Sequence, residues 1–206
     1  MTCSLISHGA AREVTGTSHE LRVGDRQILL DCGLFQGRRE ESAAKNAGLT
    51  MNARTLDALI LSHGHMDHAG RIPLLYKNGY QGPIFSTPAT RDLSEIMLMD
   101  SAYIQEKDDE FMRKHYPEKM LANAGPLYTQ KDAEECMSLF ATHEYHEPFE
   151  VLSGVSCQFY DAGHILGSAM MVLRIDRPGT SPLRIGFSGD IGRNTLLIIR
   201  DPEEMP

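Results

Sequence analysis

The chain has 206 residues, of which 41% are hydrophobic, and it carries a formal net charge of −8. This length and apolar content can bury a sizeable core, and one domain is the simplest arrangement. The acidic balance excludes a protein that coats nucleic acid by bulk electrostatics, because that mode needs clustered Lys and Arg. A nuclease is still allowed, since a bound divalent metal can supply the positive charge locally.

Membrane and disulfide signals are both missing from the sequence. No apolar run approaches the ~18 residues of a membrane span, and Met1 to His8 lacks the features of a secretory signal. The four cysteines show no Cys-x-x-Cys spacing, which argues against a disulfide framework and a zinc knuckle. We therefore expect a cytoplasmic protein that does not contact a membrane.

The first third of the chain has the alternating pattern of antiparallel strands. Strands are predicted over Cys3–Ser7, Ser18–Val23 and Gln27–Asp31, with a turn at Gly24 and Asp25. A polar loop from Gly33 to Asn52 follows. The apolar residues after it predict a further, buried strand over Ala58–Ser62.

Four potential metal ligands occur in the next six residues, His63, Gly64, His65, Met66, Asp67 and His68. The apolar spacing from Ile72 to Tyr76 predicts a helix directly after them, so the run lies at a strand-to-helix junction. In an extended segment alternate side chains share a face, which brings His63, His65 and Asp67 to one side, and His68 then turns inward at the helix start. Such a run seldom occurs by chance, so it predicts a metal site.

The remainder alternates between helices and strands. A short strand over 82–86 precedes a long helix over 89–115 with its apolar residues on or near one face, namely Leu93, Ile96, Met97, Ala102 and Ile104. A second helix is predicted over 129–140, with Thr129 as N-cap and Asp132 at the third helical position. Strands are predicted over 155–160, 169–175 and 183–188.

Three further residues follow predicted strands and are candidates for the same site. His164 and Asp190 lie in Gly-containing loops, and both are predicted metal ligands in combination with the His63 run. Asp31 ends an apolar strand, where it can hold a ligand histidine or the ligand loop by hydrogen bonds. Imidazole and carboxylate without thiolate suit zinc, while iron and manganese stay open on ligand type alone. The spacing allows two adjacent ions, with His63 and His65 on one and Asp67 and His68 on the other.

Asp31, the His63–His68 run, His164 and Asp190 occur in the order and context of the motifs of the metallo-β-lactamase fold, which the chain resembles. The stretches Gly9–Thr17 and Asp31–Gly37 are similar to the β-CASP branch, the RNA-processing nucleases related to the cleavage and polyadenylation endonuclease and its bacterial counterparts. The resemblance implies an α/β fold, a four-layer αββα sandwich of two sheets flanked by helices.

By the same resemblance, His63, His65 and His164 would hold a first zinc, Asp67 and His68 a second, and Asp190 would bridge them. A metal-bridging hydroxide would attack the RNA phosphodiester, with Asp67 orienting it or accepting its proton. The complete family site has two Zn²⁺, and one or two are expected in this chain.

The family continues beyond Asp190 with an inserted β-CASP domain and a later His that completes the second site. Residues 1–206 are therefore expected to be the N-terminal portion of a metallo-β-lactamase domain, without the β-CASP domain and the C-terminal remainder. Such an incomplete fold predicts a homodimer or a partner that covers it. His8, His19, His143 and His146 are expected to be structural or surface residues and not substitute ligands.

Two other functions remain open from the sequence. The same metal chemistry could hydrolyse a thioester, a lactone or a β-lactam. The chain could also be a noncatalytic fragment that binds metal or a partner without turnover.

Overall fold

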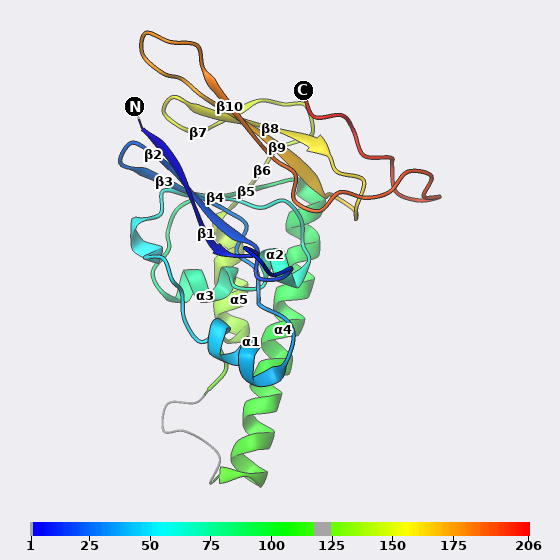
Figure 1. The fold of residues 1–206 in the computed structure, drawn as a ribbon. Helices are drawn as coiled ribbons and strands as arrows, with labels where there is room; N and C mark the ends of the chain where they lie inside the picture. The colour runs from blue at the N-terminus through cyan, green and yellow to red at the C-terminus, as the bar shows by residue number, and fades with distance from the viewer. Residues whose placement is uncertain (1, 118–124) are drawn as a thin grey trace.

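The protein is described by a computed structural model over residues 2–117 and 125–206. Two β-sheets stack face to face, and the helices lie against the far side of the larger sheet (Figure 1). None of the helices in these residues is long and apolar enough to span a membrane.

The larger sheet has six strands that follow one another in chain order. They are β1 (Cys3–Gly9), β2 (Ser18–Val23), β3 (Arg26–Leu30), β4 (Ala58–Ile60), β5 (Ile84–Ser86) and β6 (Phe140–Thr142). The first three are antiparallel, whereas β3 to β6 are parallel. Parallel neighbours need a crossover segment, and helices fill that role here. The predicted strands are confirmed, but β6 was not anticipated.

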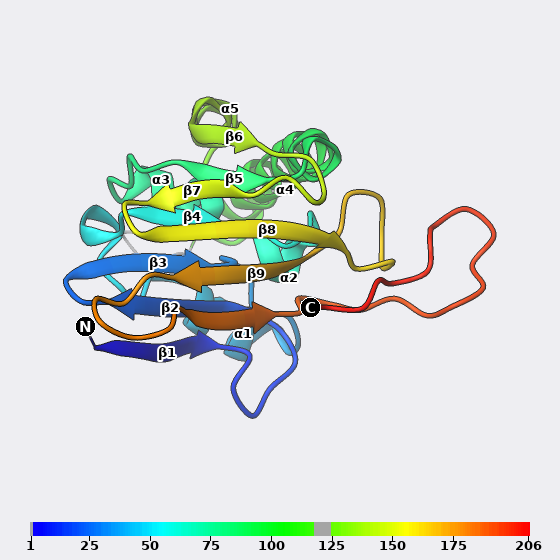
Figure 2. The ribbon, with the colours of Figure 1, turned by 90° about the horizontal axis from the view of Figure 1, so that it is seen from above.

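The second sheet has four antiparallel strands in the order β10-β9-β8-β7. Its members are β7 (Phe149–Leu152), β8 (Val155–Asp161), β9 (Ala169–Ile175) and β10 (Leu183–Phe187). Seen from above, this sheet lies over the larger one, and the strands of both sheets run along nearly the same line (Figure 2). The three strands predicted for the last third are confirmed, and β7 is an addition.

The helices are α1 (Arg39–Asn46), α2 (Met66–Ala69), α3 (Ile72–Lys77), α4 (Pro88–His115) and α5 (Gln130–Cys136). Helix α1 lies inside the segment predicted to be a polar loop, so that prediction was wrong there. Thr129 caps α5 in a capping box with Asp132, as predicted. The helix ends at Cys136, however, because a 3₁₀ turn over Met137–Leu139 leads into β6, so its predicted extension to Phe140 was wrong.

Strand β3 shows how the two hydrophobic cores arise. Leu29 packs with the helices, whereas Ile28 and Leu30 pack between the two sheets, because side chains alternate along a strand. Among residues 2–117 and 125–206 the helices gather on one side only (Figure 1), so three of the four expected layers are present.

Helix α4 buries only part of the predicted face, because Ala102 is fully buried while Leu93 and Met97 are half-buried. Its fully buried positions are Thr90, Ser94, Leu98 and Ala102, which repeat every four residues. Ile96 and Ile104, placed on the core face by the sequence, are 67% and 50% exposed. Thr90, Ser94 and Ala102 have small side chains, which let the helix approach its neighbours closely. The spacing of apolar residues in the sequence does not reveal a buried face that is made partly of hydroxyl-bearing residues.

The ends of four strands meet at one edge of the sandwich and carry the candidate ligands. Strands β3 and β4 are parallel, so their carboxyl ends lie at the same edge of the larger sheet. Strands β8 and β10 both pair antiparallel with β9, so their carboxyl ends lie at the same edge of the second sheet. Asp31 follows β3, His63 follows β4, His164 follows β8 and Asp190 follows β10. Loops at strand ends are free to present side chains, since they have no ladder to complete.

Candidate metal centre

The His63–His68 run turns from strand into helix within a few residues. His65 is the N-cap of α2, and its carbonyl accepts the N–H groups of His68 and Ala69 at 2.9 and 2.8 Å. His63 and His65 therefore lie on extended backbone, while Asp67 and His68 lie on the first helical turn. The predicted strand-to-helix junction is confirmed.

Three imidazoles converge at this junction. His65 Nδ1 lies 3.1 Å from His63 Nε2 and 3.2 Å from His164 Nε2. A tetrahedral zinc with Zn–N bonds of about 2.05 Å separates its ligand atoms by roughly 3.3 Å, which is close to these spacings. Asp190 completes a group whose ligand atoms all lie within 4.8 Å of one another.

Asp190 faces imidazoles on both sides. Its Oδ1 is 3.4 Å from His68 Nε2, and its Oδ2 is 3.6 Å from His164 Nε2. The carboxylate therefore stands between the three-histidine group and His68. A carboxylate in this position can bind two ions at once, one through each oxygen.

Asp31 is buried behind His68 and holds it. One carboxylate oxygen, Oδ2, lies 2.7 Å from His68 Nδ1 and accepts the Ser62 hydroxyl at 2.7 Å, while Oδ1 accepts the Ser62 N–H at 2.7 Å. Asp31 has φ of +60°, a left-handed conformation that Asp adopts more readily than most residues. In the neutral ring this bond assigns the proton of His68 to Nδ1 and leaves the lone pair of Nε2 facing Asp190.

Burial and charge set the protonation of the imidazoles. Burial, with His68, His65 and His164 nearby, lowers the pKa of His63 to about 2. Burial likewise lowers the pKa of His65. Burial opposes the charged form of His68 too, but the hydrogen bond and charge of Asp31 outweigh it and raise its pKa. The neutral state of His63 and His65 is the one that binds a metal.

The Asp67 carboxylate has no hydrogen-bond or ion-pair partner among the residues that the structure describes. Its charge acts on both His65 and His68, and its side chain is half-buried. The structure thus brings His63, His65, His164 and Asp190 into one group, with His68, Asp31 and Asp67 beside it.

Comparison with known proteins identifies the family. A model described as the metallo-beta-lactamase superfamily domain matches residues 20–177. The chain belongs to the metallo-beta-lactamase superfamily. The match covers the His63 run and His164.

Curated relatives of this metallo-beta-lactamase chain have names connected with RNA. It is 35% identical to Ribonuclease TTHA0252 of Thermus thermophilus over 202 residues, covering 98% of this chain and 41% of the relative. It is 33% identical to cleavage and polyadenylation specificity factor 73 of Drosophila melanogaster, covering 90% and 24%. With transcription termination factor FttA of Methanocaldococcus jannaschii the identity is 30%, covering 93% and 27%. The chain spans less than half the length of each of these relatives.

Three residues that were not predicted to be part of the site, Ser62, Thr17 and Gly33, shape the centre of this metallo-beta-lactamase domain. Ser62 links Asp31 to the run, and Thr17 Oγ1 lies 3.5 Å from His68 Nε2. Gly33 is needed for close packing, because a Cβ there would lie 1.6 Å from the Asp67 carbonyl oxygen. Two sequence signals could have pointed to these residues. Ser62 directly precedes the ligand run, and Gly33 follows the buried Asp31 by two residues.

The four histidines that were expected to be structural or surface residues make contacts away from the candidate ligands. His8 bonds Thr50 and Glu20, and His19 bonds Ser7. His143 stacks on Phe149 with ring centroids 3.9 Å apart. His146 pairs with Glu203 at 3.1 Å. None of these four histidines belongs to the group of potential ligands that the described residues form.

Proposed function

We propose that this chain carries the metal site of a zinc-dependent hydrolase that cleaves RNA phosphodiester bonds. The observation that carries the proposal is the convergence of His63, His65, His164 and Asp190 within 4.8 Å. The names of the curated relatives, a ribonuclease among them, favour RNA over other substrates of metal-activated water. The acidic net charge of −8 agrees with a substrate attracted by the metal centre and not by the whole surface.

His63, His65 and His164 would hold a first zinc, and Asp67 and His68 a second, with Asp190 shared between them. The donor set fits zinc, because imidazole and carboxylate are both zinc ligands and the nitrogen spacings of 3.1 and 3.2 Å fit a tetrahedral ion. Bound zinc supplies a Lewis acid that polarises the phosphoryl oxygens and activates water near neutral pH.

The chain's own residues then have separate tasks. Asp31 holds the proton of His68 on Nδ1, which keeps Nε2 free to bind. Asp190 lies between His68 and His164, where its two oxygens would bind the ions that these rings hold. Asp67 has a carboxylate without a hydrogen-bond partner in the described residues, so it can orient water or accept a proton at a carboxylate oxygen.

Zinc content and RNA cleavage of the purified chain test the proposal together. We expect one to two zinc ions per chain, cleavage of end-labelled RNA, and loss of cleavage with a chelator. His63→Ala should remove both zinc and cleavage, whereas the matched control His146→Ala, an exposed histidine outside the group, should retain both.

The same assay separates the competing functions. Turnover of a thioester without RNA cleavage would reassign the substrate. Full zinc occupancy with no turnover of any ester would support a noncatalytic metal-binding module. Full cleavage by His63→Ala would refute metal catalysis at this site. A size measurement on the same samples tests the predicted homodimer.

A further inference from the structure

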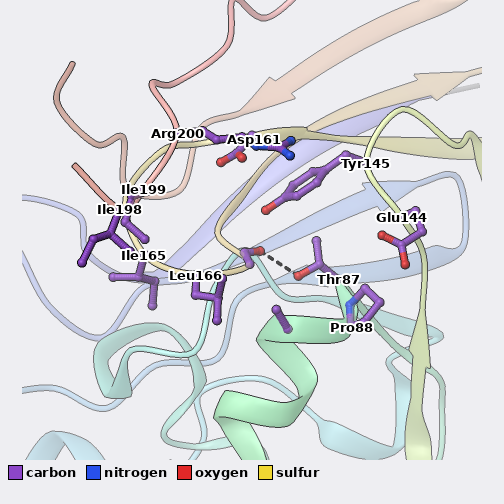
Figure 3. A pocket seen from close by; sticks show the side chains of 12 residues that line it. Thr87, Pro88, Glu144, Tyr145, Asp161, Ile165, Leu166, Ile198, Ile199 and Arg200 are labelled. Atoms are coloured by element: carbon purple, nitrogen blue, oxygen red, sulfur yellow. Dashed lines mark hydrogen bonds between the residues drawn. The ribbon is translucent and has the colours of Figure 1, made fainter. Parts of the chain in front are cut away.

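A cavity of about 420 Å³ is lined by the residues that follow the candidate ligand His164 (Figure 3). Two of its walls continue the loops that carry the candidate ligands: Ile165–Gly167 follow His164 directly, and Ile198–Arg200 begin eight residues after Asp190. The N-terminus of α4 and the segment Glu144–Tyr145 complete it. Its volume falls within the 300–1,000 Å³ typical of small-molecule sites.

The wall nearest His164 is held in place by hydrogen bonds. The hydroxyls of Thr87 and Thr90 both donate to the Gly167 carbonyl, at 2.7 and 2.8 Å. The Tyr145 hydroxyl donates to the carbonyl of Ser168 at 2.9 Å, and the Ser168 hydroxyl accepts the His164 N–H at 3.1 Å. The cavity and the ligand loop are therefore parts of one bonded structure.

The cavity has an apolar side and a carboxylate side. Ile165, Leu166 and Ile198 lie on one side in Figure 3, and Tyr145 lies across from them. Leu166 and Ile198 are 68% and 93% exposed, so both side chains are accessible to a ligand. These groups can cover the two faces of a flat ring.

Glu144 supplies a free hydrogen-bond acceptor on the other side. Among the described residues its carboxylate has no hydrogen-bond or ion-pair partner. Asp161 also lines the cavity, but its Oδ1 already accepts the Gly163 N–H at 2.9 Å. Arg200 is the one cation in the lining that the structure describes, so the two carboxylates leave an excess of negative charge that disfavours a phosphate and favours a neutral ligand that donates hydrogen bonds.

We propose that this cavity binds a nucleobase of the RNA substrate and prefers a base with an exocyclic amino group, with Glu144 as the acceptor. A base has the flat faces that the apolar side and Tyr145 cover. Cytosine presents an N4 amine where uracil presents a carbonyl oxygen, so Glu144 accepts a hydrogen bond from cytosine and repels uracil. The choice of a nucleobase rests on the proposed function, because it assumes that RNA is the substrate.

Nucleoside titrations followed by NMR test the site without any cleavage. Cytidine and uridine are added to the ¹⁵N-labelled, chelator-treated chain, and the amide signals of Leu166 and Gly167 are followed. We expect these signals to shift with cytidine, at a Kd about fivefold or more below that of uridine. Glu144→Gln should bring the two Kd values together, because an amide can donate as well as accept. The matched control is Glu147→Gln, an exposed residue outside the cavity, which should keep the preference.

Absent shifts with cytidine, equal binding of uridine, or an unchanged preference in Glu144→Gln would each overturn the proposal. The two proposals fail separately. Cytidine binding without RNA cleavage would count against the proposed function and leave the cavity site standing, whereas RNA cleavage without cytidine binding would do the reverse.

Discussion

Replacing Asp31 by asparagine tests whether a buried carboxylate sets the state of His68. The two side chains have nearly the same shape, and Asn tolerates the left-handed backbone that Asp31 adopts at φ of +60°. Any effect therefore comes from the hydrogen bonds and the charge. The carboxylate accepts from Ser62 twice and contacts His68 Nδ1 at 2.7 Å.

An amide cannot satisfy all three contacts. With its oxygen toward the Ser62 N–H, its NH₂ group faces His68 Nδ1, so the ring must accept there and carry its proton on Nε2. That nitrogen faces Asp190 at 3.4 Å and is the atom proposed to bind metal. With the amide turned over, NH₂ meets the Ser62 N–H and that bond is lost.

We expect the second zinc to bind Asp31→Asn about 10- to 100-fold more weakly, a loss of roughly 1.4–2.7 kcal/mol. Competition titration against a chromogenic zinc chelator measures this, with Asp176→Asn, an exposed surface residue, as the control. Thermal unfolding of the zinc-free variants separates loss of folding from loss of binding. Zinc affinities within twofold of the parent at both sites would refute the reasoning.

Three further predictions concern packing, thiols and a buried carboxylate. Gly33→Ala should weaken zinc binding, because its Cβ would lie 1.6 Å from the Asp67 carbonyl oxygen. In the control Gly48→Ala the Cβ meets nothing within 4 Å, so zinc binding should be unchanged, and equal zinc affinities of the two variants would contradict this prediction. A thiol reagent at neutral pH should label half-buried Cys3 rapidly in the folded chain, and rapid labelling of a second thiol would count against the structure. The other three thiols should react only on unfolding, because burial raises the pKa to about 11 at Cys32 and to about 12 at Cys136 and Cys157. Burial alone would raise the pKa of Glu20, but Arg22 and His8 lower it overall, so its contribution to the free energy of unfolding is present above about pH 4.5 and is lost as the pH falls further. Urea unfolding of the parent and Glu20→Gln should accordingly differ at pH 7 and converge toward pH 3, and a constant difference would show that the carboxylate charge is irrelevant.

The sequence predicts the central strands of the larger sheet well because their apolar runs are buried on both faces. Residues 58–60 of β4, for example, are fully buried between the helices and the second sheet. Helix α1 lacks such a signal, since the eight residues Arg39–Asn46 have no apolar stripe and no side-chain cap. Strand β6 was not predicted, and its first residue, Phe140, was included in a helix, because three residues are too few to show a period.

The four residues that the structure groups, His63, His65, His164 and Asp190, could be singled out from the sequence, whereas their surroundings could not. The His63 run, His164 and Asp190 each follow an apolar strand, and the fold brings them together at one edge. The packing of Gly33 on the Asp67 carbonyl and the bonds from Asp31 to Ser62 depend on contacts between segments about 30 residues apart. The cavity next to His164 depends on four segments that are separated in the sequence, and no local pattern predicts it.

A crystal structure of the zinc-loaded chain, with anomalous data collected at the zinc absorption edge, tests the central claim most directly. We expect an anomalous peak about 2.0–2.1 Å from the ring nitrogens of His63, His65 and His164. A second peak, where occupied, should lie between His68 and Asp190. Strong zinc peaks elsewhere, with no peak within bonding distance of the three histidines, would contradict the account.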